Sequence, residues 1–452
     1  MFMKKLLLVG SSAFLSACSQ NQNDFEVSSQ SCSSCSAGNV GVISSVSVSV
    51  SVSAIPLVTT NLNLENTESI PTKNYRSFLS IINSALEYNH RISSLPSVIE
   101  QRRAEAEIIH KNNYPTIQPV ARYYSRTTPY IGAKASYTVW DFGSSKHKEK
   151  QGELGIDNSQ LDFLIEEREV MASTVESVVK ISSLVENSRL LRESIASISK
   201  LSGFADVRFN AGVSSVSESN TLNLRLAELK SELEAINIEI ALNLDLLSAK
   251  LMSPITLNDI PSLYSITSQI LPDLGNESLQ LRQAEINKEI AFAQFQQAKS
   301  DIYPHLVLDG EVGKATNGNS IRNVGVSFQL PTSVFARSAT VNAAESAYKA
   351  TERKVTQIQT QLNNENKRIE LETNRLNNNK NTLIGLEKKG VSAIKVFGSE
   401  FEAGSATLSD GLSAYRTLLQ TRQQLISLQA QLLNLKASKI RITNGSIFNI
   451  SE

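Results

Sequence analysis

Three cysteines near the N-terminus are the side chains best suited to covalent chemistry. Cys18 follows Leu15-Ser16-Ala17, with Lys4-Lys5 and an apolar run from Leu6 to Leu15 before it. A basic start, an apolar core and a small-residue cleavage site are typical of a secretory signal peptide. The Leu-Ser-Ala-Cys ending resembles a bacterial lipobox, so we predict that residues 1–17 are removed and that Cys18 is lipidated. The alternative is an ordinary signal peptide with an incidental cysteine.

Cys32 and Cys35 have the Cys-x-x-Cys spacing of redox and metal sites. Their surroundings, Ser31 to Ser36, have no strand–helix pattern and no further ligand nearby. We therefore expect a local disulfide, formed in an oxidising compartment, in preference to redox or metal chemistry. Residues 18–73 as a whole are predicted to be a lipidated, serine-rich tether. Its alternating Val and Ser at 46–52 fit an extended or a disordered segment equally.

The remaining residues with catalytic potential are scattered. The four histidines, His90, His110, His147 and His305, form no helix-face pair and no Glu-flanked metal motif. Neither a Gly-rich phosphate loop nor a nucleophile elbow is present. Lys plus Arg and Asp plus Glu number 44 each, and removal of Lys4 and Lys5 with residues 1–17 leaves 42 − 44 = −2. We predict no enzyme activity, no cofactor, no metal site and no nucleic-acid partner.

A short stretch of the chain occurs twice. Phe209-Asn210-Ala211-Gly212 precedes one amphipathic pattern, and Phe401-Glu402-Ala403-Gly404 precedes another 192 residues later. Tyr114-Pro115 and Tyr303-Pro304 repeat at an offset of 189. Each half thus has the order helix, Tyr-Pro, strand pair, long helix, Phe-x-Ala-Gly turn, helix, which indicates duplication. The predicted units are a first repeat at 74–254, a linker at 255–275, a second repeat at 276–443 and a tail at 444–452.

With only 11 Pro and 20 Gly in 452 residues, the chain favours long helices and a mainly α fold with a small β part. Helices are expected at 74–113, 144–201, 276–301, 338–396 and 408–442, the second extending ~87 Å. Pro96 is predicted to kink or split the first helix. After Gly212, spacings of three and four mark a coiled-coil seam. Its members are Leu222, Leu226, Leu229, Leu233, Ile236, Ile240, Leu244, Leu247 and Leu251.

Four strands are predicted, at 117–126, 131–140, 305–313 and 321–330. Each has about ten residues, which suits a tilted bilayer crossing of ~9–11 residues; a soluble hairpin is the alternative. An open sheet edge cannot face lipid because its backbone groups would go unpaired. Four strands therefore have to pair with other copies of the chain, two copies giving eight strands and three giving twelve. The sequence has no run of 18 apolar residues, so we predict no transmembrane helix in the mature chain.

The chain resembles the TolC-type outer-membrane efflux protein family. The resemblance lies in the order of helix, Tyr-Pro, strand pair, Asp141-Phe142-Gly143, long helix and Phe-x-Ala-Gly, given twice behind a lipobox. The resemblance covers about 74–442. It implies three protomers that build one 12-stranded outer-membrane barrel continuous with a long α-helical coiled-coil barrel in the periplasm. It departs at Leu330-Pro331-Thr332-Ser333, where the first repeat has Trp140-Asp141-Phe142-Gly143, so the second strand-to-helix bend is expected to differ.

The same resemblance carries over a periplasmic gate. In the family a pore-closing aspartate lies six residues after the second turn glycine, which is Asp410 here. Glu218 is its equivalent in the first repeat, and a second pore aspartate falls on Ser413. Three symmetry-related carboxylates would attract cations and repel one another. The alternative for both acids is a helix N-terminal residue favoured by the helix dipole.

The resemblance also implies that the two turns contact a periplasmic adaptor, through Phe209, Ala211, Gly212, Phe401, Ala403 and Gly404. The simpler alternative is a turn that only joins helices. The implied function is a lipid-anchored exit duct of a Gram-negative outer membrane, which Ser19 after the lipobox permits. Its partners would be the adaptor and an RND (proton-driven) or ABC (ATP-driven) pump, in efflux or type I secretion. The competing hypotheses are a periplasm-spanning structural lipoprotein without a pore and an envelope-anchored enzyme.

Overall fold

The computed structural model describes residues 72–123, 129–210, 216–270, 277–331, 335–402 and 405–444, all of which belong to the unit Glu65–Glu452. The signal peptide, Cys18, Cys32, Cys35 and most of the tether lie outside the described residues. In the first repeat the elements are α1 (Thr72–Glu87), α2 (His90–Lys111), β1 (Thr116–Arg122), β2 (Tyr130–Trp140), α3 (Ser144–Asn210) and α4 (Val216–Leu251). In the second repeat they are α6 (Leu279–Ser300), β3 (His305–Ala315), β4 (Ser320–Gln329), α7 (Arg337–Glu402) and α8 (Leu408–Ile442).

The predicted helices and strands are therefore confirmed in type and order, with ends that shift by a few residues. The linker carries a short 3-10 turn, Leu257–Asp259, and a helix α5, Leu263–Gln269, which were not predicted. Within the described residues no helix is both long and apolar enough to cross a bilayer.

The split predicted at Pro96 was wrong, because α2 continues through this residue and the break lies at Tyr88-Asn89. Asn89 accepts hydrogen bonds from the N–H groups of Arg91 (2.9 Å) and Ile92 (3.1 Å). It thereby supplies partners that the first turn of a helix lacks. Pro96 is the seventh residue of α2, beyond the first turn, so the helix continues there although the proline removes one intrahelical hydrogen bond. The position of the cap therefore decided where the helix divided.

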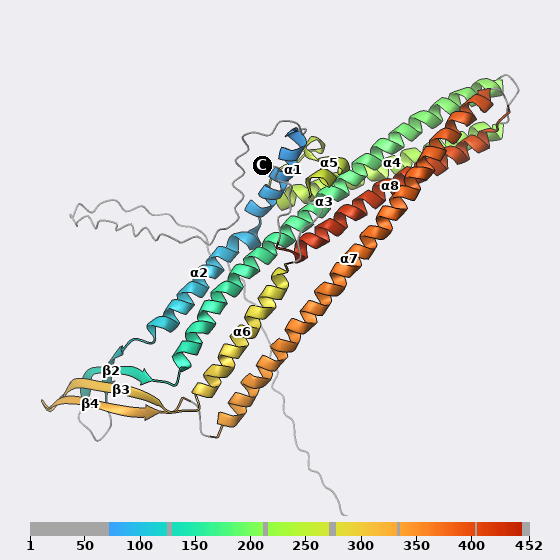
Figure 1. Cartoon of the computed structure of the whole chain (residues 1–452). Coiled ribbons are helices and arrows are strands. Elements are labelled where there is room, and N and C mark those ends of the chain that lie inside the picture. The colour runs from blue at the N-terminus through green and yellow to red at the C-terminus, as the bar shows by residue number, and fades with distance from the viewer. Residues whose placement is uncertain are drawn as a thin grey trace, which may run out of the picture. The chain divides into compact units, whose positions relative to one another are not determined.

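The long helices pack as open layers in which partners change halfway (Figure 1). Beside the sheet, the neighbours follow the order α2, α3, α6, α7; towards the far end, the order is α4, α3, α8, α7. With 67 and 66 residues, α3 and α7 run through both layers and extend ~100 Å. In both layers one edge is a first-repeat helix and the other edge is α7.

Three clusters form the core of the described residues, of which the smallest, with Leu376, Leu383 and Leu428, joins α7 and α8. Halfway along, α1 and α5 cover α3 with Phe78, Ile82 and Ile266, all at most 1 % exposed. Near the far end, Leu191, Leu222 and Phe397 belong to a second cluster that joins both repeats. Every member of the predicted α4 seam is buried or half-buried, so the coiled-coil prediction is confirmed.

The strands form one antiparallel sheet in the order β1-β2-β3-β4, with β2 paired to β3 across the repeat boundary (Figure 1). Successive side chains alternate between its faces. One face is apolar and exposed, with Ile117, Ile131, Leu308, Val312, Val324, Val326 and Phe328 between 41 % and 84 % exposed. The other face carries ion pairs between Lys134 and Asp309 (3.2 Å) and between Arg122 and Glu311 (3.3 Å). The sheet thus separates polar from apolar side chains, although neither face is covered by helices.

Tyr130 lies on the polar face across a pair of glycines. Gly132 and Gly313 are cross-strand partners, and a Cβ on either would lie 2.2 or 2.3 Å from the Tyr130 hydroxyl oxygen. This packing leaves Tyr130 only 6 % exposed. The ring therefore joins the two repeats at the centre of the sheet.

We predict that Gly313→Ala destabilises the sheet by about 1–3 kcal/mol, because the new methyl group has to displace the Tyr130 ring. Thermal unfolding of the purified protein in detergent measures this change. Gly310→Ala on the same strand is the control, since a Cβ there meets nothing within 4 Å. Equal melting temperatures for the two variants would contradict the role of Tyr130.

Candidate functional site

The two ends of the long helices hold the residues that the sequence selected. One end is the junction between strands and helices, which contains Asp141-Phe142-Gly143. The other is the end where α3 leads towards α4 and α7 towards α8, referred to below as the tip. The tip contains the predicted gate residues Glu218, Asp410 and Ser413.

At the junction, Asp141 organises the turn into α3. Its carboxylate accepts hydrogen bonds from the N–H groups of Gly143 (3.0 Å) and Ser145 (2.6 Å). The turn needs left-handed backbone at Phe142 (φ 56) and Gly143 (φ 89), a conformation that glycine adopts without steric cost. The aspartate therefore both caps the helix and holds an unfavourable backbone conformation in place.

The same turn is tied to the second repeat. The Ser144 hydroxyl donates to Asp301 (2.6 Å), and the Ser300 hydroxyl donates to the carbonyl of Phe142 (2.9 Å). The Phe142 ring stacks on Tyr303 at 4.8 Å between centroids and meets Trp140 edge-on at 6.0 Å. His305 lies 3.6 Å from Asp301. Asp301 stands between the serine and the histidine, so this trio lacks the serine–histidine contact of a nucleophilic triad.

At the tip, Asp410 is the third residue of α8 and belongs to a capping box. The Thr407 hydroxyl donates to Asp410 Oδ2 (2.5 Å), and the Asp410 N–H donates to Thr407 Oγ1 (3.3 Å). The Asp410 side chain is nevertheless exposed. Asp410 thus has the helix N-terminal role that is the alternative to a gate, and its side chain is still open to solvent.

Ser413 lies one turn further along α8 and is also exposed, whereas Glu218 is half-buried in the first turn of α4. Beside Glu218, the Ser219 hydroxyl donates to Asp206 of α3 (3.0 Å). The residues Ala211, Gly212, Ala403 and Gly404 lie outside the described residues. Phe209 is the second-to-last residue of α3. Phe401, near the end of α7, is half-buried, and its ring centroid lies 5.3 Å from that of Phe397.

Sequence reasoning missed a stripe along α8. Its exposed residues follow at alternating steps of three and four, the spacing of one helix face. They are Asp410, Ser413, Thr417, Gln420, Gln424, Ser427, Gln431 and Asn434. Apart from Asp410 all are neutral and polar, and only Ser409 and Arg416 are exposed on α8 outside the stripe. The signal was present in the sequence as a heptad of Ser, Thr and Gln opposite the leucine seam.

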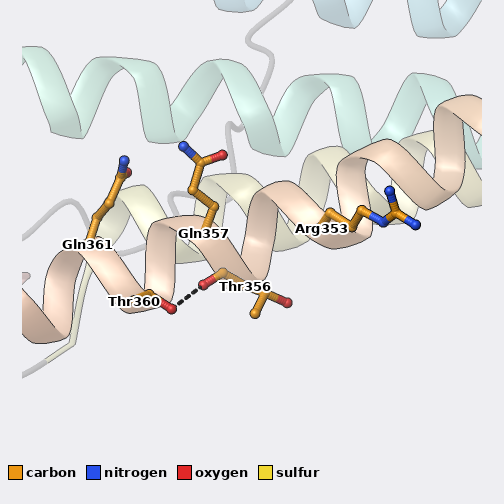
Figure 2. A pocket seen from close by; sticks show the side chains of 5 residues that line it. All are labelled: Arg353, Thr356, Gln357, Thr360 and Gln361. Carbon is orange, nitrogen blue, oxygen red and sulfur yellow. Dashed lines mark hydrogen bonds between the residues drawn. The ribbon is translucent and has the colours of Figure 1, made fainter.

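Grooves elsewhere are shallow. One lies on α7 alone, where Thr360 donates to the Thr356 carbonyl (2.9 Å) and Gln357 and Gln361 project from the helix (Figure 2). A second lies where α6, α7 and α8 meet, beside Gln280, Arg368 and Ile442. Neither brings together a nucleophile and a base, and no group of metal-ligating side chains occurs within the described ranges.

Comparison with known proteins shows what parts of the chain are similar to. Residues 270–439 match the family model described as outer membrane efflux protein. The chain carries an outer membrane efflux protein domain. The resemblance read from the sequence is thereby confirmed for this part of the chain. No curated protein matches the chain.

Solved structures share the fold of this chain. The outer membrane protein VceC of Vibrio cholerae is 16% identical with a TM-score of 0.69, over 82% of this chain and 98% of its own. The Campylobacter jejuni outer membrane channel CmeC is 16% identical with a TM-score of 0.67, over 84% and 89%. The open state of the Neisseria gonorrhoeae outer membrane channel MtrE is 16% identical with a TM-score of 0.62, over 81% and 88%.

The junction between the strands and the helices allows a test at acidic pH. Burial raises the pKa of Asp141, but hydrogen bonds from Ser145 and Gly143 outweigh it and hold the pKa below its usual value. A depressed folded-state pKa stabilises the protein above the unfolded pKa of ~3.9, and this contribution is lost as the pH falls through the folded value. We predict that Asp141→Asn lowers the unfolding free energy at pH 7 and that the difference from wild type shrinks below about pH 4.

Denaturant unfolding at pH 7 and pH 3 measures this difference. Asp157→Asn, which changes an exposed carboxylate on the same helix, is the matched control and should show no loss at pH 7. A deficit of Asp141→Asn that stays constant across both pH values would show that its charge is not what stabilises the turn.

Proposed function

We propose that this efflux protein is a passive exit duct that closes as a ring of three copies, with the sheet in the outer membrane and the helices in the periplasm. The observation that carries the proposal is the polar stripe of α8, which ends in Asp410. The fold and the match of residues 270–439 to the outer membrane efflux protein model support it. The ring, the gate and the partners are the proposal.

The open edges support a ring. The sheet ends in β1 and β4, and the helical layers end in α2 or α4 on one side and in α7 on the other. Edge strands with unpaired N–H and C=O groups are templates for pairing with another chain. Because the two edges come from different repeats, contact between copies is head-to-tail, and such a contact forms a cyclic ring when the rotation between copies closes.

The edge helices expose apolar side chains as such a contact requires. On α4, Leu224, Ile238, Leu242 and Leu246 are 57–63 % exposed; on α7, Leu371 is 61 % exposed. Contiguous exposed apolar surface on a helix indicates an interaction site. Because one edge of each helical layer is a first-repeat helix and the other is α7, the partner that fits both edges is a second copy of this chain.

The sheet fits a membrane position. Its apolar face would contact lipid and its ion-paired face would line the lumen, which is the alternation of a transmembrane barrel. At the junction, Tyr114, Trp140, Phe142 and Tyr303 are 46–60 % exposed. Aromatic side chains collect at the membrane–water interface, so this cluster marks the periplasmic edge of the bilayer. A lipid on Cys18 would anchor the tether to the same membrane.

The α8 stripe supports a lumen. Helix α8 has α3 on one side and α7 on the other, so its exposed face is not an edge. Exposed Ser, Thr, Gln and Asn side chains offer hydrogen bonds to a hydrated solute without fixed charge, and Asp410 adds a carboxylate where the stripe reaches the tip. In a ring of three, the carboxylates would form a cation-attracting constriction. Ser413 would line the next turn, and Glu218 would line or brace the same end.

The tip turns would then be the contact with an adaptor protein, and through it with a proton-driven or ATP-driven inner-membrane pump. The cargo would be small toxic compounds, metals or a secreted polypeptide, because a neutral lumen selects weakly and leaves selection to the pump.

Single-channel conductance in a planar bilayer tests the duct. We expect discrete, cation-selective steps from the purified protein, and a conductance about twofold higher with weaker cation preference for Asp410→Asn and Asp410→Ala. Asp410→Asn keeps an oxygen that can accept from Thr407, so it separates charge from capping. Asp245→Asn on α4 is the control. A protein that fails to insert would support the non-pore tether, and unchanged conductance in both variants would remove Asp410 from the gate.

The ring is tested separately. Leu242→Glu places a charge on the α4 edge, and we expect it to convert trimers into monomers, since an unpaired charge in an apolar contact costs several kcal/mol. Light scattering after size exclusion in detergent measures the mass. Tyr264→Glu on α5, where the side chain is 80 % exposed and off both edges, should leave the trimer intact. A trimeric Leu242→Glu variant would place the interface elsewhere.

A further inference from the structure

Two glycines in the α7–α8 pair receive large side chains from the opposite helix. A Cβ on Gly411 of α8 would lie 2.1 Å from Cζ of Phe397 on α7. A Cβ on Gly390 of α7 would lie 3.2 Å from Leu418 Cδ1 on α8. Each glycine is therefore a notch, and the two notches point in opposite directions between the helices.

The notches continue a regular seam. On α7 the buried residues Leu362, Ile369, Leu376, Leu383 and Phe397 fall in one heptad register, with Gly390 at the remaining position. Gly390 and Phe397 are seven residues apart, as are Gly411 and Leu418, which is the spacing of successive layers in an antiparallel coiled coil. Next to the tip, the leucine layers of the seam are thus replaced by two layers that each contain a glycine, one with Gly390 and Leu418 and one with Gly411 and Phe397.

The first repeat lacks this device within the described residues. The α3 seam there contains Leu184, Leu191, Ile198 and Ala205, all buried, and α4 supplies Leu222 and Leu229. Gly203 of α3 is exposed, and a Cβ on it would meet nothing within 4 Å. Glycine is a poor helix former, so its presence at two seam positions of α7 and α8 needs a packing reason, which Phe397 and Leu418 supply.

We propose that Gly390 and Gly411 are positioning residues that set the separation of α7 and α8 at the tip and thereby the width of the Asp410 constriction. This inference rests on the proposed duct. Asp410 directly precedes Gly411, so a shift of α8 away from Phe397 carries the carboxylate with it. In a closed ring, a wider α7–α8 contact in every copy lengthens the circumference and enlarges the opening.

The test is Gly411→Ala, for which we expect an increase in conductance of about twofold, because pore width controls ion flow. Gly390→Ala should have a smaller effect, since its contact is looser and the Leu418 side chain can rotate. Gly385→Ala and Gly398→Ala on α7 are matched controls, because a Cβ at either position meets nothing within 4 Å. Phe397→Leu in the Gly411→Ala background removes the clashing ring atoms and should restore wild-type conductance.

Two further readouts separate positioning from general damage. In the Asp410→Asn background, Gly411→Ala should add little to the conductance, because both changes act on one constriction; independent, multiplying effects would overturn the proposal. Spin labels at Ser399 and Ser409, both exposed beside the Phe397–Gly411 notch, report the helix separation with Cys32 and Cys35 replaced by serine.

A longer label distance in Gly411→Ala than in Gly398→Ala supports the notch, and an equal distance refutes it. This measurement decides the matter even if the wild-type protein inserts and stays silent, a result that would count against the duct alone.

Discussion

Hydrogen bonds between β2 and β3 join the two halves of this protein, and the rest of the architecture follows from what they leave unpaired. By pairing the inner strands of the two hairpins, they place β1 and β4 at opposite edges of one sheet. Neither edge strand can end in lipid with free backbone groups. The helices follow the same order. The sheet and both helical layers therefore have a first-repeat element at one edge and a second-repeat element at the other.

The periodic features of the fold were predictable from the sequence. Heptads of leucine on α4 and α8, alternation in the strands and the paired Tyr-Pro and Phe-x-Ala-Gly segments identify element types because each has a regular spacing. The break before α2 was not predictable in the same way, since one asparagine side chain outweighs a proline seven residues later. Helix α5 was missed because seven residues are too few to show a period.

The candidate site was predictable only in part. Asp410 was selected through the family resemblance, whereas its capping box with Thr407 follows from the Thr-x-x-Asp spacing and was overlooked. The glycine notches escaped attention because a glycine in a helix pattern reads as a weakness until its opposite residue is known. The polar stripe of α8 was missed because the leucine seam on the same helix gives the stronger periodic signal, and uncharged polar residues are common on any exposed helix face.

Only α3 and α7 extend from the sheet to the tip, and both change partners halfway, where α1 and α5 pack on α3. Helices α2 and α6 end below that level, and α4 and α8 lie above it. A rotation of α8 at the tip can therefore reach the strands only through α3 and α7, the two helices that α8 contacts and that continue to the sheet. The helices other than α3 and α7 thus form two stages in series, one beside the sheet and one at the tip, with the α1–α5 cluster between them.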